Sequence, residues 1–323
     1  MGDSDRMSAK IEIQRLTKRF GPFTAVEDVS FSVKDGEVLG FLGPNGAGKS
    51  TTMKMITGFL TPTSGTAVIC GHDVLERPRE AKRVIGYLPE GAPAYPDMTP
   101  ESFLRFVAGV RGYSGEQAAQ RVQRAGELAD LRGVMHQRIE TLSKGYKRRV
   151  GLAQAILHDP PVLIMDEPTD GLDPNQKHEV RQLIRTMAKD KVIVLSTHIL
   201  EEVQAVCTRA IIIARGRLLL DGTPAELEAR SALHNAVALE LAAAGAARAR
   251  DELAALAGVQ RVDVLDGADG LLRLRVVPAR GANLSAEIAR LAQGKGWQVQ
   301  GLTLERGRLE EVFREVTTAE AAR

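Results

Sequence analysis

The chain has 323 residues with 44% hydrophobic content, which is enough for one large domain and one small domain, each with its own core. Its 43 Lys and Arg against 41 Asp and Glu leave a formal charge of only +2, so no nucleic-acid partner is expected. From about Ile11 to about Leu220, β-rich and helical segments alternate, which predicts an α/β fold.

The first β segments, at residues 11–16, 29–33 and 67–69, alternate like half-buried strands. Near-continuous apolar runs at 38–42, 162–165 and 192–196 instead predict interior strands of a sheet covered on both faces. Between Tyr95 and Ala155 the apolar residues recur at helical spacing, so we expect a helical subdomain beside a mixed sheet core.

The composition turns Ala-rich after residue 222, and we place a boundary near Ser231, giving domains at 10–230 and 231–323. The second domain is predicted to have strands at 236–241, 260–265, 271–277 and 297–304, helices at 248–257 and 284–292, and a last helix at 309–316. That βαββαβ order is the ferredoxin-like α+β arrangement.

Residues 43–51, GPNGAGKST, match GxxxxGK[ST] directly after an apolar strand, the pattern of a phosphate-loop NTPase. Gly43, Gly46 and Gly48 remove Cβ atoms that would block a triphosphate or forbid positive φ. The helix beginning near Lys49 adds free N–H groups and a positive dipole end. Lys49 is predicted to reach the β- and γ-phosphates of a nucleoside triphosphate, and Ser50 to bind Mg²⁺. The other predicted members of the cradle are Pro44, Asn45, Ala47 and Thr51.

A second motif, VLIMDEP at residues 162–168, places two carboxylates at the end of a buried strand. Asp166 is suited to hold Mg²⁺ through water, and Glu167 to orient or deprotonate the water that attacks the γ-phosphate. Acidic pairs are usually solvated surface groups, but here four apolar residues precede the pair, which favours a site.

The segment LSKGY at 142–146, followed by KRRVGLAQAI, resembles the signature motif of ABC ATPases, commonly LSGGQ. With the two motifs above, GLDP at 171–174 and His198 after VIVLS, the order and spacing resemble a complete ABC ATPase over about residues 10 to 225. The resemblance implies a homodimer that sandwiches two ATP molecules, each between one subunit's phosphate loop and the other's signature motif.

The same resemblance assigns roles residue by residue. Ser143 and the amide of Gly145 would contact the γ-phosphate bound to the opposite subunit, at a positive helix end. Asp173 would couple the two sites. His198 would bond the γ-phosphate and Glu167.

An aromatic residue, Phe20 or Phe23, would stack on adenine; Phe20 aligns better with the family's tyrosine, and the plain alternative is a packing residue. Glu90 stands where the family usually has glutamine, and its carboxylate can still ligate Mg²⁺. Lys144 and Tyr146 replace the first glycine and the glutamine of the signature. These departures resemble a bacterial subgroup associated with gliding motility and with copper-site maturation of nitrous oxide reductase.

Residues 94–111 lie where the family docks coupling helices of a transmembrane permease, with Tyr95, Met98, Phe103 and Phe106 as candidates for the groove. The ending LEEVFREVT resembles the appended domain of type-2 exporters. We therefore expect a subunit that hydrolyses ATP for a transporter, an exporter being favoured. The alternative is a soluble ABC ATPase acting on DNA, ribosomes or a cofactor-assembly scaffold, such as an iron–sulfur assembly ATPase, although one cassette without a coiled coil or zinc-binding cysteines does not favour it.

The expected location is the cytoplasm, peripheral on the cytoplasmic face of the plasma (inner) membrane. Cys70 and Cys207 suggest neither a disulfide framework nor a zinc site, which fits a reducing compartment. No apolar run approaches the roughly 20 residues of a spanning helix, and the first ten residues lack the apolar stretch of a signal peptide. Membrane attachment is therefore expected to require a partner.

Overall fold

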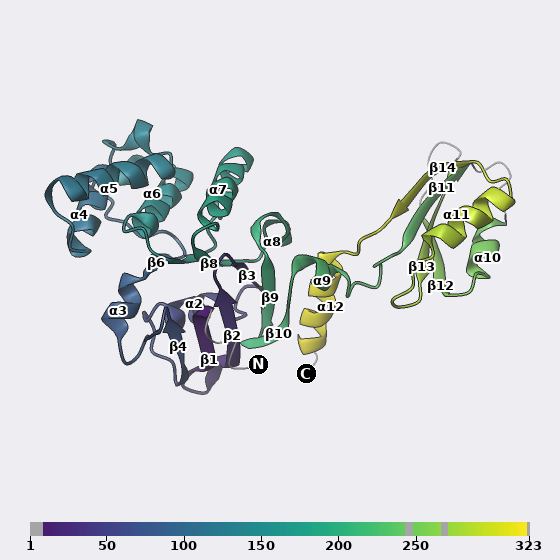
Figure 1. Cartoon of the computed structure of the whole chain (residues 1–323), viewed down its shortest axis with the longest axis horizontal. Coiled ribbons are helices and arrows are strands. Elements are labelled where there is room, and N and C mark those ends of the chain that lie inside the picture. Colours follow the sequence, from purple (N-terminus) through teal and green to yellow (C-terminus); the bar gives the residue numbers. More distant parts are fainter. Residues whose placement is uncertain (1–8, 243–247, 266–270, 322–323) are drawn as a thin grey trace. The chain divides into compact units, whose positions relative to one another are not determined.

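The structure, a computed structural model, describes residues 9–242, 248–265 and 271–321 and divides into two compact units, Met1–Thr223 and Pro224–Arg323 (Figure 1). This division falls before the boundary expected near Ser231, because helix α9 (Pro224–Glu228) packs against helix α12 (Leu309–Ala321) of the second unit. Within the described ranges, no helix has the length and apolar character needed to cross a membrane.

The larger sheet of the first unit has six strands, in the order β10 (Arg217–Gly222), β9 (Arg209–Ala214), β3 (Val38–Leu42), β8 (Val192–Thr197), β7 (Val162–Asp166) and β6 (Ile85–Leu88). Neighbouring strands run parallel except for the antiparallel pair β9 and β10. Every residue of β3, β7 and β8 is buried, which confirms the prediction of interior strands covered on both faces.

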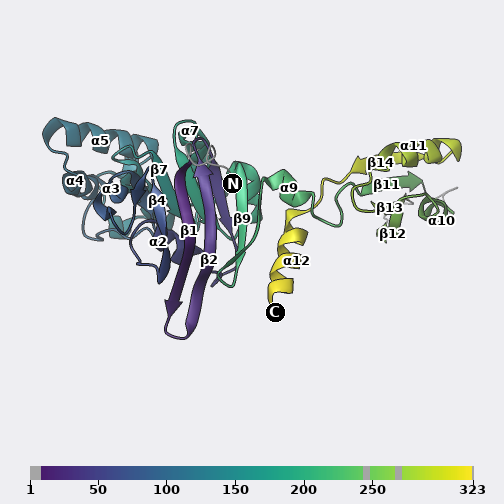
Figure 2. The same cartoon turned by 60° about the horizontal axis from the view of Figure 1, so that its bottom comes forward.

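A second, antiparallel sheet has the order β2 (Phe23–Lys34), β1 (Ala9–Phe20), β4 (Ser64–Ile69) and β5 (His72–Asp73). Its two long strands, β1 and β2, form an extended hairpin (Figure 2). Helix α2 (Lys49–Ile56) contacts β1, β2 and β4 of this sheet and β7 and β8 of the larger one. Its buried face, with Met53, Met55 and Ile56, therefore joins the two sheets in one core.

The helical subdomain predicted between Tyr95 and Ala155 is confirmed: α4 (Pro100–Val110), α5 (Gly115–Leu128) and α6 (Lys144–Ile156) gather on one side of the first unit (Figure 1). Helix α4 begins at a capping box in which Thr99 accepts from the Ser102 amide. The remaining helices in the described part of this unit are α3 (Pro78–Arg83), α7 (Pro174–Met187) and α8 (Leu200–Val206), with short 3₁₀ turns at Arg132–Val134 and Ile139–Thr141.

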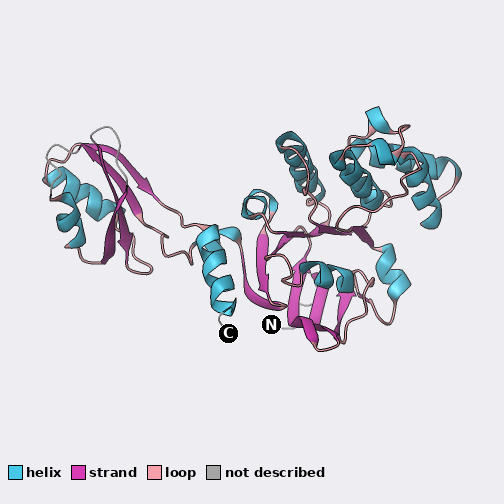
Figure 3. Cartoon of the chain, turned by 180° about the vertical axis from the view of Figure 1, so that it is seen from behind, coloured by secondary structure: helices cyan, strands magenta, loops and turns pink. Residues whose placement is uncertain are grey.

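The second unit contains, after α9, the elements β11 (Val237–Ala242), α10 (Ala249–Ala254), β12 (Val259–Leu265), β13 (Leu271–Pro278), α11 (Ser285–Gly294) and β14 (Val299–Leu304), followed by α12. The strands form an antiparallel sheet in the order β12-β13-β11-β14. Helices α10 and α11 lie on one face of this sheet (Figure 3), where Leu239, Leu274 and Ile288 are fully or almost fully buried. The order of elements is the predicted βαββαβ order.

Candidate active site

The predicted site motifs follow four strands that are neighbours in the parallel sheet. β3 leads into the phosphate loop, β8 into His198, β7 into Glu167, and β6 into Glu90. Because parallel strands have their carboxyl ends at one edge, segments far apart in sequence meet there, at the edge where ligands bind in open α/β sheets.

The phosphate loop is shaped by glycines with different tasks. A Cβ on Gly43 would lie 2.5 Å from the Ile213 carbonyl oxygen, and one on Gly48 would lie 2.6 Å from that of Ala25. Gly46, at φ 78°, is exposed, and a Cβ there would meet nothing within 4 Å, so the outer side of the loop is open. The following helix α2 has no side-chain N-cap and no acidic residue in its first turn. Its leading N–H groups therefore suit an anion.

Lys49 lies inside this loop with only 5% of its surface exposed. Its ammonium donates to the carbonyl oxygens of Gly43 at 2.8 Å and Pro44 at 3.2 Å, and lies 3.7 Å from Glu167 Oε1. Burial lowers the pKa of Lys49, while the neighbouring carboxylates of Glu167 and Asp166 oppose that shift. The Lys49 ammonium therefore lies inside the loop, where the oxygens of a bound triphosphate can replace the two carbonyl oxygens as its hydrogen-bond acceptors.

Asp166 is fully buried and fits a magnesium ligand. Its Oδ1 accepts from the Ser196 hydroxyl, but its buried Oδ2 has no hydrogen-bond partner among the residues that the structure describes. An unpaired buried carboxylate oxygen is costly, and Mg²⁺ takes oxygen ligands. Ser50, in the first turn of α2, and Glu90, on the loop after β6, are the other predicted metal ligands.

Glu167 adopts a left-handed backbone, with φ 51°, which costs a non-glycine residue about 1–2 kcal/mol. Its amide donates to the backbone oxygen of Ser196 at 3.2 Å and to the Ser196 hydroxyl at 3.1 Å. Its carboxylate faces both Lys49 and His198, whose Nδ1 lies 3.2 Å from Oε1. The structure therefore brings Lys49, Asp166, Glu167 and His198 together, and this arrangement can hold a water between a base and a phosphate.

Two buried charges around this cluster were missed by the sequence analysis. Glu202 of α8 is 2% exposed and accepts from Thr169 and, at 2.7 Å, from Thr197, so it connects the segment after β7 with the end of β8. Arg148 of α6 is 5% exposed and donates to backbone oxygens beside Glu167. Burial lowers the pKa of its guanidinium. Charged residues on helices are usually exposed, so nothing in the sequence indicated that Glu202 or Arg148 would be buried. Arg148 does belong to the stretch KRRVGLAQAI that follows the signature motif.

The signature residues lie outside this cluster, at the start of α6. Ser143 is exposed and N-caps the helix, accepting from the Tyr146 amide at 3.3 Å. Gly145 is buried, and a Cβ on it would lie 2.4 Å from Gln176 Oε1. Their contact with ATP on a second subunit stays a prediction.

Two further residues near the signature gain local roles. Lys144 forms an ion pair with Asp170 at 2.8 Å, so the cation introduced by this departure from the family is matched within its own chain. That ammonium lowers the pKa of Asp170. Asp173 N-caps α7, its Oδ1 accepting from the Gln176 amide at 2.9 Å. Its role between two sites stays a prediction, beside this structural role that the sequence analysis did not foresee.

The two candidate adenine-stacking residues face each other across the β1–β2 turn. Phe20 is 49% exposed and Phe23 is 61% exposed, so neither ring is buried in the core of the chain. The Lys18 ammonium lies 5.2 Å from the centre of the Phe20 ring. Both rings are accessible to a base, and the choice of Phe20 stays a prediction.

We expect Glu90→Gln to retain kcat within about threefold at saturating Mg²⁺, because an amide oxygen can replace a carboxylate oxygen as a ligand. Losing the negative charge should raise the Mg²⁺ concentration for half-maximal activity by roughly two- to tenfold. Steady-state ATPase assays over a magnesium titration measure both values. A loss of kcat above about tenfold that extra Mg²⁺ does not restore would contradict this role for Glu90.

Comparisons with known proteins agree with the motifs. Residues 26–170 match the family model described as ABC transporter. The Escherichia coli protein named "Probable multidrug ABC transporter ATP-binding protein YbhF" is 41% identical over 223 residues, which are 69% of this chain but only 38% of that protein, so the chain spans less than half of this relative. "Nod factor export ATP-binding protein I" of Paraburkholderia xenovorans is 38% identical over 257 residues, covering 79% of this chain and 83% of that protein.

A solved structure of the ATP binding subunit of an ABC transporter is 33% identical, with a TM-score of 0.62, and covers 68% of this chain and 91% of that one. Both the sequence relatives and the fold therefore lead to one class. The chain belongs to the ABC ATPases, the ATP-binding proteins of ABC transporters, which confirms the resemblance read from its motifs.

Proposed function

We propose that this chain is the ATP-hydrolysing subunit of an ABC exporter, and that two copies pair around two ATP molecules. The observation that carries the proposal is the meeting of Lys49, Asp166, Glu167 and His198 beside the uncapped start of α2. Export is supported by the word "export" in the name of the Nod factor relative.

The chain's own groups divide the work of hydrolysis. The amides of the phosphate loop and Lys49 would bind the β- and γ-phosphates, and Ser50, Asp166 and Glu90 would hold Mg²⁺. When bound, Mg²⁺ neutralises charge on the phosphate oxygens. Glu167 orients the attacking water and accepts its proton, while His198 bonds the γ-phosphate and keeps the carboxylate in place. Ser143 and Gly145 of the second copy close the site.

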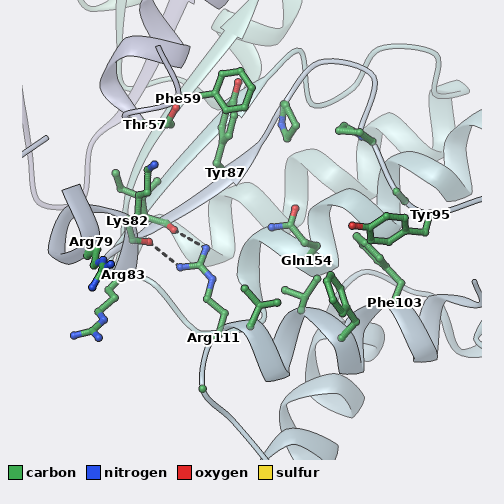
Figure 4. A pocket seen from close by; sticks show the side chains of 18 of the residues that line it. Thr57, Phe59, Arg79, Lys82, Arg83, Tyr87, Tyr95, Phe103, Arg111 and Gln154 are labelled. Atoms are coloured by element: carbon green, nitrogen blue, oxygen red, sulfur yellow. Dashed lines mark hydrogen bonds between the residues drawn. The ribbon is translucent and has the colours of Figure 1, made fainter. Parts of the chain in front are cut away.

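A groove of about 1100 Å³ in the first unit supplies the proposed contact with a membrane permease. One wall carries Tyr95 and Phe103, whereas α3 brings Arg79, Lys82 and Arg83 to the other (Figure 4). Phe106 also lines the groove, with its ring centre 5.6 Å from that of Tyr95. Tyr95 and Phe106 are 50% and 45% exposed. We infer that the occupant is a cytoplasmic helix of the permease with an apolar face and carboxylates beside it. Met98 does not line the groove.

The experiment is affinity purification of the tagged full chain from detergent-solubilised membranes. The unaltered chain should bring down a polytopic membrane protein, and Phe106→Glu should reduce its recovery at least about tenfold, because burying a charge against apolar side chains costs more than the 1.4 kcal/mol of a tenfold change. Leu75→Glu is the matched control, since Leu75 is 46% exposed and does not line the groove. Recovery of ribosomes, DNA or a soluble scaffold in place of a membrane protein would support the alternative function.

The second unit is proposed to be a ferredoxin-like accessory domain of the exporter type. Its βαββαβ order and antiparallel sheet support this assignment. The permease would place the whole assembly on the cytoplasmic face of the plasma membrane.

A further inference from the structure

The guanidinium of Arg148 donates hydrogen bonds to backbone oxygens of two separate segments. Its Nη2 donates to the carbonyl oxygens of Asp166 and Glu167, its Nε donates to that of Pro168 at 3.4 Å, and its Nη1 donates to that of Pro89 at 3.0 Å. Within the described residues, these hydrogen-bond partners are all backbone oxygens and none is a carboxylate oxygen. This buried cation is therefore satisfied by peptide groups, whose positions it constrains.

Three of these oxygens belong to successive residues, with Glu167 in the middle. The amide of Glu167 is held from the other side by Ser196, as described above. The peptide groups before and after Glu167 are thus both fixed, although its φ of 51° is unfavourable for a residue with a side chain. The direction of its carboxylate follows from that backbone, so Arg148 acts on the carboxylate without touching it.

The fourth oxygen, of Pro89, immediately precedes the predicted metal ligand Glu90. One turn further along α6, Gly151 lets the helix approach the same loop, because a Cβ there would lie 2.6 Å from the Ala92 Cβ. The signature residues stand at the start of α6, where Ser143 is the N-cap and Gly145 lies in the first turn. One helix therefore contacts both carboxylate-bearing segments and presents the signature motif.

We propose that Arg148 is a positioning residue for hydrolysis, which keeps Glu167 and the Glu90 loop in fixed register with the signature helix. The ATP that the signature of α6 contacts is the one bound to the opposite subunit, so its binding would in this way be sensed at Glu167 of this subunit's own site. The proposal rests on the proposed function, because it requires Glu167 to activate that water.

Arg149 provides a matched comparison on the same helix. It is equally buried, at 5% exposure, but its guanidinium pairs with Asp130 at 2.9 Å and with Glu179, away from the Glu167 segment. A Lys substitution at either position keeps the charge and removes the planar fork. If these arginines matter only for packing or stability, both Lys variants should lose activity. If Arg148 positions Glu167, only Arg148→Lys should lose activity.

The experiment compares Arg148→Lys with Arg149→Lys in the full chain, using kcat and KM for ATP, the Kd of a fluorescent ATP analogue and the melting temperature. We expect Arg148→Lys to lower kcat roughly 10- to 100-fold while KM and Kd stay within about threefold, since small misplacement of a catalytic group has costs of that size. Arg149→Lys should leave kcat per ATP-binding site within about threefold. If Arg148→Lys does not fold, Arg148→Gln, which keeps two N–H donors, takes its place.

A double-mutant cycle with Glu167→Gln separates this proposal from a structural role. If Arg148 acts through Glu167, adding Arg148→Lys to Glu167→Gln should lower the residual activity less than twofold. The proposal would be overturned if Arg148→Lys lowered activity as much in the Glu167→Gln variant as in the unaltered chain. It would also be overturned if Arg148→Lys alone had the kcat of the unaltered chain. Failure of Glu167→Gln alone to reduce hydrolysis would instead overturn the proposed role of Glu167, so the two failures are distinguishable.

Discussion

Glu167→Gln is expected to lower kcat for ATP hydrolysis by about 10²- to 10⁴-fold, the usual contribution of a general base, while ATP still binds. The amide keeps the size of the side chain and its contact with His198 Nδ1 at 3.2 Å, but it cannot accept a proton. Removing the negative charge 3.7 Å from the Lys49 ammonium also leaves that cation freer to bind phosphate. Binding of ATP should therefore be retained or strengthened.

Size-exclusion chromatography with ATP and Mg²⁺ gives the second readout for this variant. If ATP closes the dimer and hydrolysis opens it, Glu167→Gln should elute as a dimer with ATP and as a monomer without it. Glu201→Gln is the matched control, because Glu201 pairs with Arg181 at 3.1 Å on an exposed surface. Unchanged turnover in Glu167→Gln would remove the base assignment, and a monomer with bound ATP would contradict the sandwich.

Local sequence patterns predicted those parts of the site that depend on backbone shape. The apolar runs 38–42, 162–165 and 192–196 identified the interior strands, because a strand covered on both faces has no polar side. The glycines around Lys49 identified the phosphate loop, since few other sequences permit its conformation. Both signals are contained in short segments.

Other parts of the site depend on contacts between distant segments. Arg148 is 18 residues from Asp166, and Glu202 is 33 residues from its partner Thr169. The sequence around Arg148 or Glu202 does not show that a distant segment will cover the side chain, so each charged helix residue is expected to be exposed. The observed division after Thr223 differs from the boundary expected near Ser231 for the same reason. Helix α9 belongs to the second unit because it packs against α12, which lies far along the chain.

Lys49→Ala is expected to weaken ATP binding itself, about 10- to 100-fold in Kd. A charge-assisted hydrogen bond contributes about 1.5–3 kcal/mol, and each 1.4 kcal/mol is tenfold. The effect on binding should exceed that of any other single change considered, because Lys49 is the one cation held inside the phosphate loop among the residues that the structure describes. Losing it also removes a cation that interacts with the carboxylates of Asp166 and Glu167, so the triphosphate meets less compensated negative charge.

Isothermal titration with ATP and Mg²⁺ measures this change directly. Lys10→Ala alters the net charge equally at a surface ion pair, with Asp35 at 3.3 Å, and should leave Kd within about twofold. The contrast with Glu167→Gln is the decisive point: one variant loses binding and the other loses only turnover, although their charged atoms lie 3.7 Å apart. Equal losses of binding in both would mean that the pair serves the fold of the loop, and that the separate roles given to cation and base are wrong.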